Sequence, residues 1–219
     1  MDRTIGSKWI KTEVLQKNPF IANHIPETAI FSEQHLKTML EKHKMVFVKP
    51  IHGGGGNGVI RVKKEGEKYS YTKMAHTSSF SSYGAMYRSL MSIKLKRKYL
   101  IQQGIVLARI DGRPIDYRVK FVKKENQWTF TAMLGRLARP GLVITNVCKG
   151  GTLLKCRVAL RRSLPHIHAK TKQQEMRGLT RTCTVLLEEE FPGIGQLGFD
   201  YGLDRSGKIW ILEVNTRPQ

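Results

Sequence analysis

Apolar residues recur at helical spacing in some segments of the chain and alternate with polar residues in a larger number of short ones. Spacings of three and four residues predict helices over 8–17, 32–43, 81–96 and 172–191. Alternating or short buried runs predict strands over 28–31, 45–49, 59–62, 69–73, 99–105, 113–122, 128–136, 196–203 and 208–215. Residues 138–170 show neither pattern and are expected to be irregular. The hairpins predict antiparallel sheets, so the fold class is expected to be α+β.

A glycine-rich segment, His52–Val59, separates two predicted strands. Glycine lets backbone N–H groups approach phosphate oxygens closely, which makes the segment a candidate phosphate-binding loop. It satisfies the pattern G-x-G-x-x-G, but a Rossmann fingerprint opens a helix, whereas Val59–Val62 continues as a β-branched strand. A strand, a glycine loop and a second strand are typical of a flap over nucleotide phosphates, and Lys49 ends the first strand. A flexible hairpin tip is the alternative.

The C-terminal hairpin carries acidic and amide side chains on apolar strands. Residues two apart on a strand share a face, so Glu213 and Asn215 are expected to point to one side. Leu212 and Val214 are then expected to point into the core. Asp200, on the preceding strand, is the second carboxylate of this hairpin.

The expected pairing of this hairpin brings its two carboxylates together. If Leu203 pairs with Lys208 across a four-residue turn, Asp200 lies diagonal to Glu213 on the same face, and Glu213 faces Gly198. Like charges this close repel unless a cation lies between them. Oxygen ligands suit Mg²⁺, with Mn²⁺ as an alternative. The hairpin therefore predicts a metal site at Asp200, Glu213 and Asn215, and an exposed acidic strand face is the alternative.

A second hairpin carries basic side chains. Asp116, Arg118 and Lys120 share a face by the same alternation, and pairing across an expected loop of residues 123–127 adds Arg136 to it. Arginine suits bidentate contact with phosphate or carboxylate. A solvated strand face is the alternative. The apolar strand Tyr99–Ile105 offers backbone groups that could hold an adenine ring.

The order of these motifs resembles the ATP-grasp superfamily, and most nearly its endospore-coat-associated, YheC/YheD-like branch. The order is a lysine, a glycine flap, Gln-Gln-Gly-Ile, Asp-x-Arg, a second arginine, Asn-x-x-x-Gly-Gly, Asp and Glu-x-Asn. The segments that carry the closer resemblance are Lys8-Trp9, residues 24–28, residues 99–105 and Thr145-Asn146. The resemblance spans nearly the whole chain.

The resemblance implies a set of ATP contacts. Lys8 and Lys49 would touch the phosphates and the adenine side, with Lys11 as an alternative to Lys8. The backbone of Gln103 and Ile105 would hold adenine. The implied flap glycines are Gly53, Gly54, Gly55, Gly56 and Gly58.

The resemblance also implies roles around the reacting groups. Asp116 would lie near the ribose, and Arg217 would approach the substrate. The groups implied to contact the phosphates or an acyl phosphate are Arg118, Arg136 and Asn146. Asp200, Glu213 and Asn215 would bind the metal, in agreement with the face argument above.

The resemblance implies an architecture of two α+β subdomains whose antiparallel sheets clasp ATP. The expected glycine-flap lobe is 28–105, and the expected metal-binding lobe is 106–219 with 1–27. Related enzymes carry an N-terminal domain before this region, and the chain is expected to lack it. A partner protein or domain that supplies that lobe is one alternative.

Composition adds charge to this picture. The 219 residues include 38 Lys+Arg and 17 Asp+Glu, a formal net charge of +21. Such a field attracts polyanions, including nucleic acid and acidic polymers. Residues 155–172 are especially basic. No nucleic-acid-reading motif accompanies them, and aromatic residues do not interleave with the basic ones.

The cysteines and the first residues of the chain bear on the cellular compartment of the protein. Cys148, Cys156 and Cys183 form no CxxC pair, which favours a reducing compartment. The first residues have no apolar signal-peptide core, and no apolar run approaches the ~20 residues of a membrane span. A cytoplasmic protein, associated with the endospore coat by resemblance, is expected.

Three functions follow as hypotheses. The first is a carboxylate–amine ligase that binds ATP and Mg²⁺ and forms an acyl phosphate, with an unidentified acid and amine and an acidic peptide or polymer as one candidate substrate. The second is a non-catalytic, nucleotide-binding spore-coat component. The third is a nucleic-acid-binding protein that acts through its charge.

Overall fold

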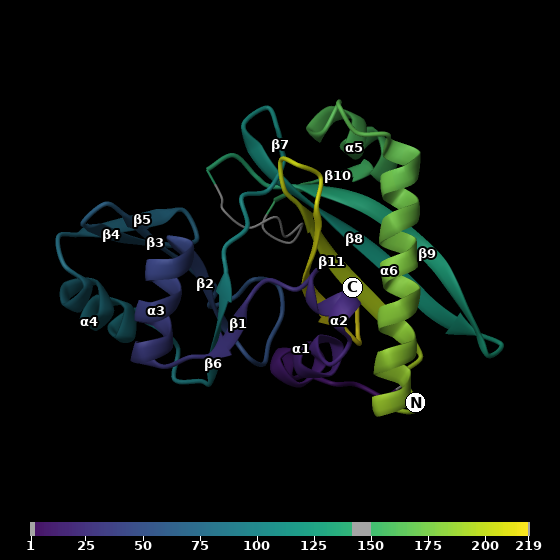
Figure 1. Ribbon diagram of the computed structural model, residues 1–219, viewed down its shortest axis with the longest axis horizontal. Coiled ribbons are helices and arrows are strands. Elements are labelled where there is room, and N and C mark those ends of the chain that lie inside the picture. The colour runs from purple at the N-terminus through teal and green to yellow at the C-terminus, as the bar shows by residue number, and fades with distance from the viewer. Residues whose placement is uncertain (1–2, 142–149, 219) are drawn as a thin grey trace. The chain divides into compact units, whose positions relative to one another are not determined.

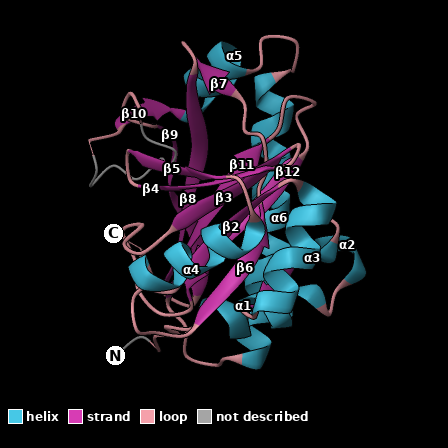
Figure 2. Ribbon diagram, turned by 90° about the vertical axis from the view of Figure 1, so that its left-hand side faces the viewer, coloured by secondary structure: helices cyan, strands magenta, loops and turns pink. Residues whose placement is uncertain are grey.

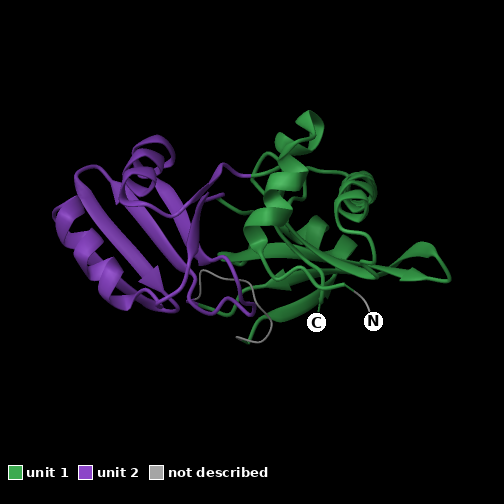
Figure 3. Cartoon of the chain, turned by 90° about the horizontal axis from the view of Figure 1, so that it is seen from below, with its two compact units in different colours: residues 1–25, 106–140, 145–219 green, residues 26–105, 141–144 purple. Residues whose placement is uncertain are grey.

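A computed structural model describes residues 3–141 and 150–218 of the chain (Figure 1). The chain divides into two compact units (Figure 3). Unit 1 comprises residues 1–25, 106–140 and 145–219, and unit 2 comprises residues 26–105 and 141–144. Each unit has an antiparallel sheet and helices, so the predicted α+β class is confirmed.

Unit 2 is a sheet with the strand order β1-β6-β2-β3-β4-β5. Its elements are β1 (Thr28–Ile30), α3 (Glu33–His43), β2 (Met45–Pro50), β3 (Ile60–Glu65), β4 (Lys68–Lys73), β5 (His76–Phe80), α4 (Tyr83–Ile93) and β6 (Tyr99–Gln103). Helix α3 begins where the sequence predicts, because the hydroxyl of Ser32 accepts a hydrogen bond from the N–H of His35 at 3.0 Å.

One face of the unit 2 sheet packs against both helices and forms an apolar core. Alternate strand residues point there, among them Val46 and Val48 of β2. The buried residues of the two helices that meet them are Leu36, Met39 and Leu40 of α3 and Met86 and Leu90 of α4. By the same alternation Lys49 and Arg61 lie on the opposite face of the sheet, away from α3 and α4, which we call the helix-free face. That face therefore carries charged side chains beside Phe47.

Unit 1 is a sheet with the order β10-β9-β8-β11-β12, and β7 pairs with β8. Its elements are α1 (Lys8–Gln16), α2 (Pro19–Ala22), β7 (Arg109–Ile110), β8 (Arg113–Lys124), β9 (Gln127–Leu137), β10 (Thr152–Lys155), α5 (Cys156–Ser163), α6 (Ala169–Glu190), β11 (Gln196–Leu203) and β12 (Ile209–Asn215). The long helix α6 runs alongside the strands of this sheet (Figures 1 and 2).

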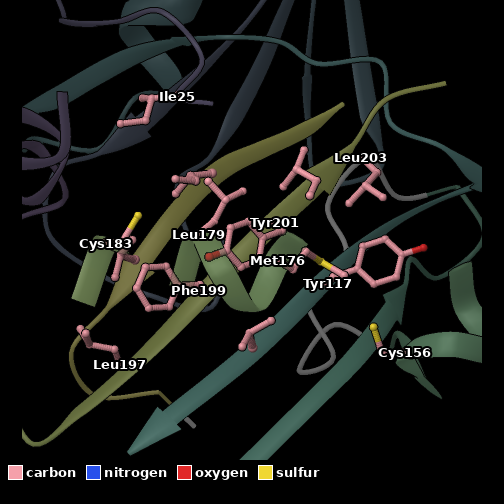
Figure 4. Packing of buried hydrophobic residues seen from close by; sticks show 14 of the residues in the cluster. Ile25, Tyr117, Cys156, Met176, Leu179, Cys183, Leu197, Phe199, Tyr201 and Leu203 are labelled. Atoms are coloured by element: carbon pink, nitrogen blue, oxygen red, sulfur yellow. The ribbon is translucent and has the colours of Figure 1, made fainter. Parts of the chain in front are cut away.

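The unit 1 core lies between the sheet and α6. Figure 4 shows Met176, Leu179 and Cys183 of α6 packed with Phe199 and Tyr201 of β11. Each fully buried apolar side chain of this size contributes about 1.5–3 kcal/mol. Because side chains alternate along a strand and Phe199 and Tyr201 are in the core, the odd-numbered residues of β11 face the core and the even-numbered ones face the opposite surface of the sheet.

The N-terminal helices of unit 1 cover the outer edge of β12. The N–H of Ile211 donates to the carbonyl of His24 at 2.7 Å, and the imidazole Nδ1 of His24 lies 2.8 Å from the carbonyl oxygen of Ile209. An edge strand otherwise presents unpaired backbone groups. These contacts fix β12 from its outer side.

The prediction that residues 138–170 are irregular is wrong where the structure describes them. Strand β10 and helix α5 lie there. Helix α5 has only three buried residues, Cys156, Ala159 and Leu160, among basic ones, which hides its periodicity. Gly135 of β9 allows the helix to pack closely, because a Cβ there would lie 2.4 Å from the Cβ of Ala159.

The predicted loop over residues 123–127 is also wrong. Lys124 pairs with Gln127, so Glu125 and Asn126 form a two-residue turn. Both have positive φ, 47° and 62°, as a type I′ turn requires. Strand β5 was not predicted, because its sequence, His-Thr-Ser-Ser-Phe, is mostly polar.

Candidate functional site

The surface of the unit 1 sheet opposite α6 carries a cluster of charged residues. On β8, Tyr117 and Val119 are buried in the core, and Asp116 and Arg118 point to the opposite surface. Arg136 of β9 lies directly opposite Asp116. These positions share the face that the sequence predicts.

The two carboxylates of the C-terminal hairpin are closer than predicted. Asp200 of β11 lies directly opposite Glu213 of β12, not diagonal to it, and Gly198 lies opposite Asn215 rather than Glu213. The predicted register is wrong because Leu203 pairs with Ile209 instead of Lys208.

A β-bulge in β12 shifts the register of this hairpin by one further residue. Tyr201 pairs with Ile211 and Asp200 pairs with Glu213, so Leu212 is an extra residue between the two pairs. Ile211 is consequently buried and Leu212 is only partly buried. The prediction that Leu212 lies in the core is wrong.

Two arginines hold Asp200. Arg118 donates to both oxygens of this carboxylate, with its Nη2 at 3.1 Å from Oδ2, and the Nη2 of Arg136 lies 3.1 Å from the same Oδ2. Arg136 also donates from Nε and Nη2 to the two oxygens of Asp116, at 2.7 and 2.5 Å. The result is a continuous chain of ion pairs, Asp116–Arg136–Asp200–Arg118, across three strands.

Burial differs along this chain of ion pairs. The Arg136 side chain is 7% exposed and the Arg118 side chain 15%. Desolvation acts to lower the pKa of Arg136, but the carboxylates of Asp200 and Asp116 outweigh it and raise that pKa. Arg136 is therefore a permanent buried cation, and Arg118 is the more accessible of the two.

Helix α1 brings lysines to Glu213. The Nζ of Lys8 lies 3.5 Å from Oε1 of Glu213. Lys11 is 4% exposed, and its Nζ donates to the carbonyl of Ile5 at 2.7 Å. Burial lowers the pKa of Lys11 to about 8, although the Glu213 carboxylate acts in the opposite direction. The N–H of Ile5 in turn donates to the hydroxyl of Thr216 at 2.8 Å.

The C-terminal segment lies over Gly198. A Cβ at Gly198 would come within 2.4 Å of the Cβ of Pro218 and 3.5 Å of a guanidinium nitrogen of Arg118. Arg217 is exposed beside it. Glycine at position 198 therefore leaves room for both Pro218 and Arg118.

The donor set fits a hard divalent cation. Asp200, Glu213 and Asn215 supply two carboxylates and an amide oxygen from adjacent strands. A carboxylate offers about four acceptor sites, so Asp200 keeps capacity for a cation beside its arginine hydrogen bonds. Across residues 3–141 and 150–218, no three His, Cys, Asp or Glu side chains form a group that could hold a metal ion. A site with one or two carboxylates is sufficient for Mg²⁺, because this ion keeps several of its waters and binds phosphate oxygens of the substrate.

Unit 2 carries the other predicted residues. The Nζ of Lys49 donates to Oε1 of Gln102 at 2.5 Å, on the helix-free face of the sheet. The sequence position of Gln102 does not predict its contact with Lys49. The contact follows from the pairing of β2 with β6. The side-chain amide of Gln102 also donates to Thr28 at 3.2 Å.

The glycine flap joins β2 to β3, as predicted. Its glycines with positive φ are Gly53, Gly55, Gly56 and Gly58. At Gly58 a Cβ would lie 2.9 Å from the Tyr99 hydroxyl, so a side chain does not fit there. Local turns close the flap, in which Asn57 N–H donates to Gly54 and Val59 N–H to Gly56, both at 3.3 Å.

Strand β6 ends at Gln103, the first predicted adenine contact. The N–H of Gln103 donates to the carbonyl of Glu27 at 2.8 Å, and its side-chain oxygen accepts from the N–H of Glu27 at 3.2 Å. Ile105 is the last residue before the chain passes into unit 1. Asn146, the remaining predicted residue, lies outside the described residues.

No helix in the described part of the chain is long and apolar enough to cross a membrane.

Comparisons with known proteins agree on one family. A family model described as YheC/D-like ATP-grasp matches residues 1–219. The curated proteins YheD and YheC of Bacillus subtilis (strain 168), both called endospore coat-associated, are each 27% identical over 99% of this chain. The chain spans 49% of YheD and 61% of YheC.

Solved structures show the same fold. An N5-carboxyaminoimidazole synthase from Aspergillus clavatus, in complex with ADP and 5-aminoimidazole ribonucleotide, matches with a TM-score of 0.61 and 14% identity. An N5-carboxyaminoimidazole synthetase from Staphylococcus aureus complexed with ADP matches with a TM-score of 0.61 and 12% identity. Each match covers 99% of this chain and 46% of the other chain.

Proposed function

Because the chain belongs to the YheC/D-like ATP-grasp family, we propose that it binds ATP with Mg²⁺ and activates a carboxylate as an acyl phosphate, which an amine then attacks. The observation that carries the proposal is the row formed by Arg118, Asp200 and Glu213 on three adjacent strands. That row combines the cationic and anionic groups that phosphoryl transfer requires.

Asp200, Glu213 and Asn215 are proposed to hold the metal. Bound there, Mg²⁺ supplies positive charge to the phosphate oxygens of ATP. Asp200 and Glu213 are directly opposite each other, and two like charges at that spacing favour a cation near both. Lys8 is proposed to leave Glu213 for the phosphates when nucleotide binds, since its 3.5 Å ion pair is long.

Arg118 and Arg136 are proposed to have different roles. Arg136 is held by both oxygens of Asp116, whereas among the described residues Arg118 donates to Asp200 alone, and its side chain is more exposed. Arg118 is therefore the residue proposed to contact the transferred phosphoryl group. The resemblance put Asp116 near the ribose, but both of its oxygens accept hydrogen bonds from Arg136. We therefore propose that Asp116 positions that guanidinium.

Residues of unit 2 are proposed to bind the rest of the nucleotide. Lys49 would exchange Gln102 for a phosphate oxygen, and the flap N–H groups of Gly53–Gly58 would contact the phosphates. The backbone of Gln103 and Ile105 is proposed to hold adenine.

Asn146 and Arg217 are proposed to act on the acyl phosphate and the acid substrate. The curated relatives support an association with the endospore coat as a further part of the proposal.

Calorimetric titration with ATP and Mg²⁺ tests nucleotide binding. Glu213→Gln removes one metal ligand charge and is expected to weaken Mg²⁺-dependent binding by at least about tenfold, equivalent to about 1.4 kcal/mol. Glu189→Gln, an exposed change on α6, is the matched control and should bind as the parent does. An unchanged affinity in Glu213→Gln would refute the metal assignment.

Turnover needs a separate measurement. Hydroxylamine traps acyl phosphates as hydroxamates, so incubation with ATP, Mg²⁺ and a panel of carboxylic acids should yield ADP and a hydroxamate with the correct acid. Nucleotide binding without ADP release across the panel would instead assign the chain as a non-catalytic nucleotide-binding protein.

A further inference from the structure

A basic surface in unit 1 lies outside the proposed ATP-binding residues. The sequence from Gln127 to Gln174 contains no aspartate or glutamate. Within it, exposed basic residues lie on α5, just before it and at the start of α6. Figure 1 labels these two helices. We define the basic surface as Lys155, Arg157, Arg161, Arg162, His166, His168 and Lys170.

Contacts between α5 and α6 bring these side chains together. Arg157 and Arg161 are four residues apart on α5 and therefore lie on the same side of the helix, about 5–6 Å apart at Cβ. The Nε of Arg157 donates to Oε1 of Gln173 on α6 at 2.8 Å. Lys170 lies one turn before Gln173 on the same helix. The cations of the two helices thus form one surface.

Carboxylates of the chain neutralise little of this surface. Among the described residues, Arg162 is the one member with an ion pair, to Asp111 at 2.9 Å, and both side chains of that pair are exposed. Arg157 and Arg161 have the i, i+4 spacing at which like charges destabilise a helix. The surface therefore keeps a net positive charge that a polyanion would neutralise.

Among the described residues, the edge of the unit 1 sheet at β10 has no further partner strand, and it lies next to the basic surface in the chain. Strand β10 is the last strand of its sheet, and within the described residues it pairs with β9 alone. Leu153 of β10 is 49% exposed, and Lys155 is exposed beside it. Leu153 lies opposite Arg136 and therefore points to the same sheet face as the ion-pair chain. The edge thus offers backbone hydrogen bonds, an apolar contact and a cation.

We propose that β10 and the basic surface together bind an acidic polypeptide segment, which adds to β10 as an extra strand. Backbone pairing at an open edge supplies affinity for any extended peptide, and side chains beside the edge supply selectivity. The cations select acidic residues, and Lys155 disfavours pairing with the edge of a second, equally basic copy of this chain.

The surface fits a polypeptide better than a nucleic acid. A nucleic acid has no backbone groups that can pair with a strand edge. Residues 131–190 contain no Phe, Trp or Tyr, so the larger aromatic rings that single-strand-binding proteins use to stack unpaired bases are missing from this segment. The proposal stands apart from ATP binding, because it uses none of the residues assigned to the nucleotide or the metal.

Fluorescence anisotropy with a labelled, alternating Glu-Thr peptide tests the proposal. The variant R157A/R161A/K170A removes three exposed cations of the surface and should weaken binding about tenfold. The control K68A/K96A/K98A removes the same charge from exposed positions of unit 2 and should change affinity less than about twofold. An equal loss in both variants would refute a defined surface, because overall charge would then account for binding.

A second probe tests the strand addition itself. The same peptide with every backbone nitrogen methylated has no N–H group to donate to β10 and should bind at least about tenfold more weakly. Equal binding of the methylated peptide would overturn strand addition. Tighter binding of a DNA duplex than of the peptide, at matched charge and salt, would overturn the polypeptide assignment. The affinity of R157A/R161A/K170A for ATP should equal that of the parent, which separates this test from that of the proposed function.

Discussion

Asp200 of β11 lies directly opposite Glu213 of β12, and the extra residue Leu212 makes this pairing possible. A regular ladder continuing from Tyr201 and Ile211 would put Leu212 opposite Asp200 and turn Glu213 towards the core. The bulge keeps Ile211 and Val214 buried while it holds both carboxylates on the charged face. Arg118, Arg136 and Lys8 then supply the positive charge that two adjacent carboxylates need.

The two carboxylates should differ in their effect on stability. Asp200→Asn removes the carboxylate partner of Arg118 and leaves Arg136 with Asp116 as its remaining partner, and it should lower the free energy of unfolding by about 3–5 kcal/mol. Glu213→Gln removes only a partly exposed, 3.5 Å ion pair with Lys8 and should cost less than about 1 kcal/mol. Urea unfolding of both variants without ATP or metal measures the difference. Equal losses would mean that Asp200 is not held as described.

Arg136 and Arg118 should also differ in how much they contribute to the free energy of unfolding. Arg136→Lys loses the planar fork that binds Asp116 and should destabilise the fold by about 3 kcal/mol or more. Arg118→Lys keeps Arg136 beside Asp200 and should remain within about 1 kcal/mol of the parent.

Nucleotide assays complete this comparison of arginines. Arg118→Lys should lower the rate of ADP release at least about tenfold with nearly unchanged urea unfolding, because a lysine lacks the planar pair of parallel N–H donors with which arginine contacts a phosphoryl group. Stability loss in Arg118→Lys equal to that in Arg136→Lys would contradict the division of roles.

The faces of the strands could be predicted from the sequence, but their registers could not. Alternation along the chain puts Asp116 and Arg118 on one face of β8 and Glu213 and Asn215 on one face of β12, and the structure agrees. The turn between β8 and β9 was predicted too long, because Glu125 and Asn126 both adopt positive φ without a glycine.

Long-range contacts account for the rest of what the sequence did not predict. The resemblance implies Lys11 as an alternative ATP contact and does not predict its burial, which follows from the packing of α1 and the carbonyl of Ile5. Helix α5 depends on Gly135, a residue more than twenty positions earlier in the chain. Neither contact leaves a local pattern, because each depends on which segments meet in the fold.

Two glycines should respond in opposite directions to alanine. A Cβ at Gly135 would lie 2.4 Å from the Cβ of Ala159, so Gly135→Ala must push α5 away from β9 and should cost about 1–3 kcal/mol. Gly178 lies in the middle of α6 and has no atom within 4 Å of its Cβ position. Gly178→Ala should therefore stabilise the protein by about 0.5–1 kcal/mol. Thermal and urea unfolding measure both changes, and a stabilised Gly135→Ala would contradict the close packing of α5.

The buried ammonium of Lys11 should make stability depend on pH in the alkaline range. Its pKa is lowered by burial from 10.5 to about 8 in the folded protein. Between those two values the unfolded chain binds more protons than the folded one, so the free energy of unfolding should rise with pH. Below about pH 8 both states are protonated, and the full penalty of burying the charge, roughly 3 kcal/mol, is present.

Lys11→Met removes the titrating group and keeps the length of an unbranched side chain. Relative to this variant, the parent should gain roughly 3 kcal/mol of unfolding free energy as pH rises from about 7 to about 10.5. At neutral pH the variant escapes the burial penalty but loses the hydrogen bond to Ile5, so the slope of the difference with pH is more informative than its value there. Lys96→Met, at an exposed position of unit 2, should show no such slope. A flat difference between parent and Lys11→Met across this range would mean that the ammonium of Lys11 is solvated in the folded protein.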